Sequence, residues 1–162
     1  MPTILLTTEI KADIQICFDL SRSIDLHKLS TVKTQEEAID GITEGLIRHG
    51  EFVTWEAIHF GIKQKLTSRI TAFENPFHFR DEQEKGSFKF IKHDHYFEQD
   101  ANYVLMRDIF EFDSPFGILG KIFNKLILTK YLTKFLVERN QLIKEFAETE
   151  KWKSVLQESD YL

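Results

Sequence analysis

The segment "HDHYFEQDANYVLMRDIFEFDSPFG" spans residues 93–117 and predicts two β-strands followed by the start of a helix. Apolar and polar residues alternate along the second strand, so one of its faces should point inward. That face carries Val104, Met106, Asp108, Phe110 and Phe112. On the first strand, His93 and His95 share a face with Phe97. The segment therefore predicts histidine and aspartate side chains inside an otherwise apolar interior.

A six-residue loop between these strands would set their register and place His93 opposite Asp108. The same register pairs His95 with Met106, and Phe97 with Val104. An inward imidazole needs hydrogen-bond partners, and Asp108 would supply one for His93. Three roles stay open for this pair. It fixes the strand register, it meets the polar end of a bound molecule, or it acts as a general acid/base pair.

A β-hairpin is predicted upstream, where EFVTWEAIHF and KQKLTSRITAF flank Gly61-Ile62. A two-residue loop that begins with Gly is typical of a type II′ turn. Its register pairs Trp55 with Ser68. The inward face of the first strand then carries Val53, Trp55, Ala57 and His59. The next strand, near FHFRDEQE, is predicted to point inward with Phe77, Phe79, Asp81 and Gln83. The sequence indicates no partner for Asp81.

Helices are predicted in the sequence both before and after the run of strands. After a strand over residues 3–10, Asp13 is placed to cap a short helix, and a second short helix covers residues 24–29. Thr34 and Glu37 fit a capping box, which predicts a helical turn there.

At the other end, the apolar spacing predicts one helix from Ile118 to about Glu148, roughly 45 Å long. Residues 150–162 follow as a predicted polar tail.

Length and composition are those of one globular domain: 162 residues, 42% hydrophobic and 29% charged. The net charge of −5 and the lack of a Lys/Arg block argue against a nucleic-acid partner. No apolar run approaches the ~18 residues of a membrane span, and no signal peptide is evident. Cys17 is the single cysteine. It excludes an internal disulfide and favours a buried thiol in a reducing, cytoplasmic compartment.

Six short motifs, in their order along the chain, resemble the START/Bet v 1-like (SRPBCC) superfamily and its uncharacterised bacterial ligand-binding members. They are RSIDLH, GLIRHGEFVTW, HFGIKQKLTSRIT, FRDEQEKGSF, HDHYF and SPFGILG. The resemblance implies an α+β helix-grip fold. A curved antiparallel sheet of six to seven strands would wrap around the long C-terminal helix, with two short helices after the first strand. It also implies one domain over residues 1–149 and a cavity between sheet and helix.

Our leading hypothesis from the sequence is intracellular binding of a small hydrophobic or amphipathic molecule in that cavity. The predicted ligand-binding residues are Trp55, Ser68, Phe79, His93, His95, Met106, Asp108, Phe110, Phe116 and Leu119. Phe116 and Leu119 lie in the glycine-containing SPFGILG segment and are predicted to gate the cavity mouth. No cofactor is expected, and the protein is expected to be a monomer or a weak homodimer.

Two other functions stay open at this point. One is a polyketide cyclase or dehydratase-like enzyme, in which His93 is the general acid/base and Asp108 orients it. The other is a protein-interaction module, which predicts an exposed apolar patch and a small or absent cavity. A metal site is not expected. His93 and His95 place two imidazoles on one side of a strand, but the sequence fixes no third ligand.

Overall fold

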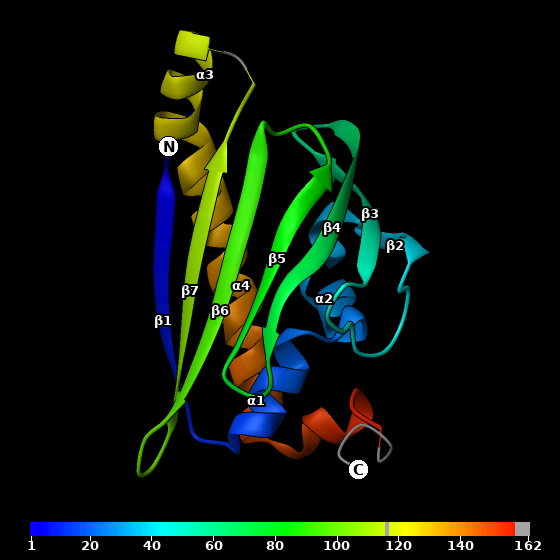
Figure 1. Cartoon of the computed structure of the whole chain (residues 1–162), viewed down its shortest axis with the longest axis vertical. Helices are drawn as coiled ribbons and strands as arrows, with labels where there is room; N and C mark the ends of the chain where they lie inside the picture. Colours follow the sequence, from blue (N-terminus) through cyan, green and yellow to red (C-terminus); the bar gives the residue numbers. More distant parts are fainter. Residues whose placement is uncertain (116, 158–162) are drawn as a thin grey trace.

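The computed structural model describes residues 1–115 and 117–157, which form an antiparallel seven-stranded sheet packed against helices (Figure 1). The strand order is β1-β7-β6-β5-β4-β3-β2. The strands are β1 (Thr3–Ile10), β2 (Glu37–Gly41), β3 (Phe52–His59), β4 (Ile62–Glu74), β5 (His78–Lys85), β6 (Phe90–Gln99) and β7 (Val104–Asp113). The predicted α+β class and the antiparallel sheet are confirmed.

Two short helices follow β1, as predicted: α1 (Ile14–Ser21) and α2 (Ile24–Ser30). Asp13 caps α1, because its Oδ1 accepts a hydrogen bond of 2.8 Å from the backbone N–H of Gln15. Ser23 caps α2 through a bond of 3.1 Å from the backbone N–H of Leu26. Each cap satisfies a backbone donor that the helix itself leaves unpaired.

The long C-terminal helical segment consists of α3 (Gly117–Phe123), a π-helical turn (Asn124–Leu128) and α4 (Thr129–Glu148). Figure 1 shows α4 running along one face of the sheet, while α3 extends past the ends of β6 and β7. A short 3-10 helix (Glu150–Ser154) follows, and Leu156 beyond it is buried in the core. Within the described part of the chain, no helix combines the length and the apolar character that crossing a lipid bilayer requires.

Two apolar clusters fill the space between the sheet and the helices. The first core surrounds α1 and includes Ile10, Phe18, Phe79, Phe97, Met106 and Ile143. The second core lies nearer the start of α4 and consists of Ile4, Ile91, Phe110, Phe112, Leu128 and Leu136. Inward residues of the sheet enter both clusters, as the two-residue alternation along the strands predicted.

The predicted register of β6 and β7 is wrong by two residues. The structure pairs His95 with Asp108, and His93 with Phe110. The loop holds four residues rather than six, because Gln99 still pairs with Val104. The Gln99 side chain stabilises this short loop by donating to the backbone oxygens of Asp100 and Tyr103. A shift of two residues keeps every side chain on its predicted face, so His93, His95 and Asp108 do point inward and are buried.

The predicted turn between β3 and β4 is also wrong. The two loop residues are Phe60 and Gly61 rather than Gly61 and Ile62, and Trp55 therefore pairs with Leu66 instead of Ser68. Phe60 and Gly61 have φ angles of 53° and 74°, which is the type I′ pattern. Phe60 accepts this left-handed backbone while its ring packs 4.7 Å from that of Tyr131. The inward face of β3 is nevertheless the predicted one.

Two smaller predictions fail for local reasons. Phe77, expected inside, is 51% exposed, because it belongs to the turn before β5 rather than to the strand. The helical turn expected at Thr34–Glu37 is instead the end of a 3-10 turn (Val32–Thr34) followed by the edge strand β2. Pairing with β3 gives the backbone of β2 the hydrogen bonds that a helical turn would otherwise have supplied.

Cys17 is fully buried in the first core, and burial is the main cause that raises the pKa of its thiol to about 12. We expect labelling by a thiol reagent at pH 8 to be at least about a hundredfold slower in the native protein than in denaturant, because the thiolate is the reactive form. The measurement is the increase in absorbance with time as a chromogenic disulfide reagent reacts with the thiol and releases its coloured product. Rapid labelling of protein whose circular dichroism is unchanged would contradict this packing.

Candidate functional site

A cavity of about 190 Å³ lies between the sheet and α4, with residues of both cores around it. Strands β3 to β7 supply one wall, and α4 together with the α1–α2 region from Ser21 to His27 supplies most of the rest. Most of the wall is apolar, and representative lining residues are Val53, Trp55, Ile70, Phe110, Leu132 and Leu136. Five polar lining residues converge at one place: Ser68, Asp81, His93, His95 and Arg139. The other polar lining residues are Ser21, Arg22, Ser23, His27, Glu36 and His59. An apolar chamber with a few converging polar groups is the usual form of a small-molecule site.

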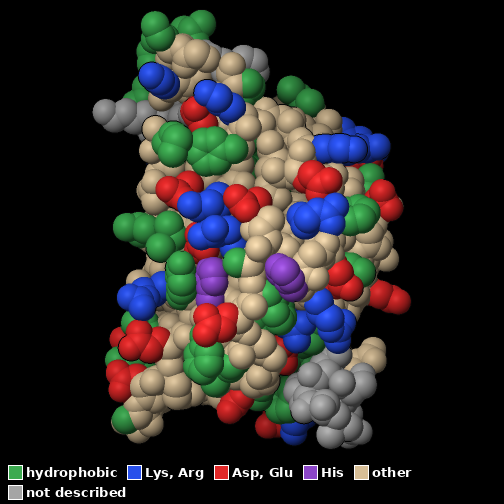
Figure 2. Space-filling view, viewed as in Figure 1, with side chains coloured by type: hydrophobic (Ala, Val, Ile, Leu, Met, Phe, Trp, Pro, Cys, Tyr) green, Lys and Arg blue, Asp and Glu red, His purple; other side chains and the backbone are tan. Residues whose placement is uncertain are grey.

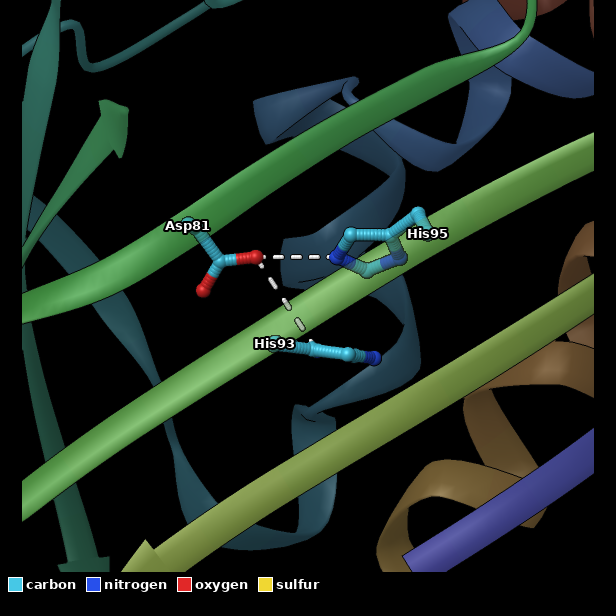
Figure 3. Close-up of side chains that lie close together, drawn as sticks. All are labelled: Asp81, His93 and His95. Atoms are coloured by element: carbon cyan, nitrogen blue, oxygen red, sulfur yellow. Dashed lines mark hydrogen bonds and ion pairs between the residues drawn. The ribbon is translucent and has the colours of Figure 1, made fainter. Parts of the chain in front are cut away.

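The converging groups come from two neighbouring strands. Asp81 lies on β5, and His93 and His95 lie on β6, where all three side chains point toward one another (Figure 3). Asp81 Oδ2 lies 2.8 Å from His95 Nε2 and 3.9 Å from His93 Nδ1. The two imidazole rings are 3.7 Å apart between centroids. We call Asp81, His93 and His95 the histidine–aspartate cluster.

Asp108 on β7 lies behind this cluster and is 1% exposed. Its Oδ1 is 2.8 Å from His93 Nε2. The same oxygen is 3.2 Å from His95 Nδ1, a contact whose angle is not that of a hydrogen bond. An ionised carboxylate only accepts hydrogen bonds, so the proton between Asp108 and His93 belongs to His93 Nε2. Asp108 therefore turns the other nitrogen of His93, Nδ1, toward Asp81.

Neighbouring side chains hold both carboxylates in place. Ser68 donates to Asp81 Oδ1 at 3.2 Å. Asn140 on α4 donates to Asp108 Oδ2 at 2.6 Å, and Arg139 Nη1 lies 3.6 Å from Asp108 Oδ1. The ring of Phe79 stacks on His95 with centroids 4.1 Å apart. These contacts fix the orientation of the polar groups before any molecule enters the cavity.

Burial and charge set the protonation states at pH 7. Burial raises the pKa of Asp81, but the hydrogen bond from His95, and the positive charge that His93 carries at the low pH where Asp81 titrates, outweigh it and lower this pKa to about 2. Burial likewise opposes ionisation of Asp108, yet its contacts with the two histidines hold its pKa well below the usual range. Burial is the largest cause that lowers the pKa of His93. We therefore describe both carboxylates as ionised and His93 as neutral.

The predicted site residues divide into three groups. Those that line the cavity are Trp55, Ser68, Phe79, His93, His95 and Phe110. Met106 and Asp108 are fully buried behind the wall, Met106 in the first core and Asp108 beneath the histidines. Leu119 is 78% exposed on α3 and is not among the lining residues, while Phe116 lies outside the described residues.

Sequence reasoning missed the parts of the site that come from α4 and the partner of Asp81. Arg139 and Asn140 are 7% and 3% exposed and reach the cluster from the middle of the helix. A polar pair between the apolar positions Leu136 and Ile143 is the signal that would have indicated them. The β5–β6 register, which sets Asp81 opposite His93, depends on the intervening loop and is not visible in the sequence pattern.

Solved structures with the same architecture come from bacteria and plants. The protein TTHA0849 of Thermus thermophilus superposes with a TM-score of 0.67 at 14% identity, covering 88% of this chain and 97% of that one. A START superfamily protein of Mycobacterium smegmatis gives 0.67 at 9% identity over 88% and 97%. The major latex-like protein 151 of Panax ginseng gives 0.67 at 16% identity over 91% and 98%. This chain has the START/Bet v 1-like helix-grip fold.

The resemblance predicted from the sequence motifs is thus confirmed at the level of the fold. No protein-family model matches the sequence, and no curated protein matches it either. The helix-grip fold explains why the cavity lies where it does, because the sheet curves around α4 and leaves the space between them to be filled or left open. Function has to be argued from the side chains that line that space.

Proposed function

We propose that the protein binds a small, mostly apolar molecule in the cavity between the sheet and α4. The observation that carries this proposal is the cavity itself, with mostly apolar walls and a cluster of oriented polar groups. The apolar part of the molecule packs against side chains such as Val53, Ile70 and Leu136. Its polar end meets Ser68, Arg139 and the histidine–aspartate cluster. The buried, unpaired Cys17 fits the reducing, cytoplasmic setting that we propose for this activity.

The size of the cavity limits the ligand class. About 190 Å³ is slightly more than the roughly 150 Å³ of an engineered cavity that binds benzene. It is below the roughly 300–1,000 Å³ of sites that enclose drug-sized molecules. We therefore expect a compound with one ring, or a short branched chain, that carries a hydrogen-bonding group. A long acyl chain would need the walls to move.

A thermal-shift and native mass spectrometry series tests the proposal. Single-ring phenols and carboxylic acids of about ten non-hydrogen atoms should raise the melting temperature and give one bound molecule per chain. A sixteen-carbon fatty acid at the same concentration serves as the size control. If none of the small compounds stabilises the protein or stays bound in the mass spectrum, the proposal fails.

A cavity-filling variant makes the test specific to this site. Val53→Phe, on the inward face of β3, should raise the Kd of a bound compound at least about tenfold, because the larger ring occupies the ligand's space. Ile58→Phe is the matched control, since Ile58 lies on the outer face of the same strand and is 40% exposed. Equal weakening by both variants, measured by calorimetry, would show that the compound binds elsewhere.

A cyclase or dehydratase-like activity remains a second candidate because His93 lines the cavity. As a neutral imidazole paired with Asp108, it could take a proton from a bound carbonyl compound. Mass spectrometry of a compound recovered after incubation separates the two proposals. An unchanged mass supports binding alone, and loss of water that depends on His93 supports catalysis.

The interaction-module alternative has less support. Ile118, Leu119 and Ile122 on α3 are exposed, as is Phe60 in the adjacent hairpin. However, the outer face of the sheet carries interspersed acidic and basic side chains (Figure 2), including the Lys92–Glu111 ion pair at 2.6 Å. The alternative also called for a small or absent cavity, and the described residues line one large enough for a single-ring compound.

A further inference from the structure

We propose that the histidine–aspartate cluster is a binding site for a divalent transition-metal ion, with Asp81, His93 and His95 as its three ligands. The sequence alone offered two imidazoles and no third ligand. The structure supplies the third, because β5 places the Asp81 carboxylate against both rings (Figure 3). One nitrogen or oxygen from each of these residues lies within 4.8 Å of the other two. This inference goes beyond the proposed function and does not depend on an organic ligand.

The distances suit a metal ion after small side-chain movements. An ion held at about 2.1 Å from nitrogen and oxygen donors separates those donors by roughly 2.9–3.5 Å. Asp81 Oδ2 and His95 Nε2 are 2.8 Å apart, and Asp81 Oδ2 and His93 Nδ1 are 3.9 Å apart. These two separations differ from the required range by about half an ångström or less. The ligating nitrogens of His93 and His95 lie within 4.8 Å of each other. Rotation of the Asp81 carboxylate, whose side chain is 28% exposed, and of the two rings would bring all three donors into that range.

Asp108 provides the outer support that such sites usually have. In protein metal sites, a ligating histidine commonly donates its other N–H to a carboxylate, which fixes the tautomer and the ring orientation. Asp108 Oδ1 does this for His93 at 2.8 Å and lies 3.2 Å from the second nitrogen of His95. With an ion bound at Nε2, neutral His95 would carry its single proton on Nδ1, facing Asp108, and the metal bond would replace the hydrogen bond from Nε2 to Asp81. Asn140 and Ser68 hold the two carboxylates.

The donor set and the charge decide which ions fit. Two imidazoles and one carboxylate suit Zn²⁺, Fe²⁺ or Co²⁺ better than Mg²⁺ or Ca²⁺, which prefer oxygen ligands only. The carboxylates of Asp81 and Asp108 lie here with the buried Arg139 beside Asp108, and a divalent cation would balance the second negative charge. Three protein ligands leave a coordination position facing the cavity, where water or the polar end of a bound molecule can sit.

Calorimetric titration of the full-length, untagged, chelator-treated protein with ZnCl₂ tests the site, without any organic compound present. We expect one ion per chain. His95→Gln and Asp81→Asn should each weaken binding at least about a hundredfold, since each removes a ligand. His59→Gln is the matched control. His59 lines the same cavity, but its ring pairs with Tyr131 at 2.8 Å and belongs to no such cluster among the described residues, so binding should be unchanged.

A milder variant and a spectroscopic readout keep the test decisive if a ligand variant fails to fold. Ser68→Ala keeps all three ligands and removes only the hydrogen bond to Asp81, so affinity should fall about tenfold. Bound Co²⁺ should show the visible absorption bands of a four- or five-coordinate site. The inference is overturned if the wild-type protein binds neither Zn²⁺ nor Co²⁺ at millimolar concentrations of the ion. It is also overturned if folded His95→Gln and Asp81→Asn bind as tightly as the wild type.

Discussion

Replacing Asp108 with Ala is expected to lower the free energy of unfolding by about 3–5 kcal/mol. Asp108 is 1% exposed and accepts from His93 at 2.8 Å and from Asn140 at 2.6 Å. Arg139 lies 3.6 Å away and is also buried. Removing the carboxylate leaves donors on β6 and α4 without an acceptor in a place that water reaches poorly. Leaving these buried donors unpaired costs more free energy than the intact hydrogen bonds contribute, on balance, to stability.

Urea unfolding followed by circular dichroism measures this change. Glu111→Ala is the matched control, because Glu111 lies on the outer face of the same strand and pairs with Lys92 at 2.6 Å near solvent. Its removal should cost about 1 kcal/mol or less. Asp108→Asn keeps the shape but loses the charge and should fall between the two. If Asp108→Ala and Glu111→Ala lower the free energy of unfolding equally, the buried network stabilises the protein no more than a surface ion pair does.

The sequence was sufficient to predict which side of β3, β6 and β7 faces inward. A side-chain period of two residues is a local property, so Val53 and Trp55 on β3, and His93 and Asp108 on β6 and β7, are all on the side that alternation assigned. The order of elements and the six motifs were sufficient for the helix-grip fold. None of these inferences required knowledge of how two strands align.

Strand alignment is where sequence reasoning failed, and the failures share a cause. Register depends on loop length, and both predicted loops were misplaced. The hairpin turns at Phe60-Gly61, and the β6–β7 loop is two residues shorter than expected. His95, rather than His93, therefore lies directly opposite Asp108, and His93 reaches it diagonally. The partner of Asp81 depends on a third register, that of β5 and β6, and could not be predicted at all.

Contacts from α4 were hidden for a different reason. A helix pattern is recognised by its apolar residues, so Arg139 and Asn140 counted only as interruptions in the stripe. The structure shows that they are buried and directed at the polar cluster. The gate predicted at Leu119 rested on its place next to glycines. In the structure Leu119 is exposed on α3, beyond the end of the sheet, where a local sequence pattern cannot say what it faces.

The position of the cavity between two separate cores matters for its use. The first core includes Phe18 and the second includes Phe112. Core residues such as Val53, Ile70 and Leu136 also line the cavity, so the same side chains stabilise the fold and form the binding wall. Phe18 and Phe112 do not line the cavity, so substitutions there should change folding more than binding.

Phe18→Ala is the substitution in the first core with the largest expected cost, a loss of about 3–5 kcal/mol in the free energy of unfolding. Phe18 on α1 is fully buried. Its ring meets those of Phe73, Phe79 and Phe97 edge-on, each at 5.4 Å between centroids. Removing it leaves a cavity that the surrounding strands cannot close, and it takes away the aromatic contacts that dock α1 on the sheet.

Phe77→Ala makes the same chemical change at a site that is 51% exposed, so it should alter stability by no more than about 0.5 kcal/mol in the same urea experiment. The comparison separates burial from the loss of an aromatic ring as such. Phe18 also supports Phe79, whose ring stacks on His95, so Phe18→Ala should weaken Zn²⁺ binding while Phe77→Ala leaves it unchanged. A folded Phe18→Ala protein that lost less than about 1 kcal/mol would show that α1 is docked mainly by other contacts, such as the Arg22 guanidinium, which lies 5.4 Å from the ring centroid of Phe73 on β4.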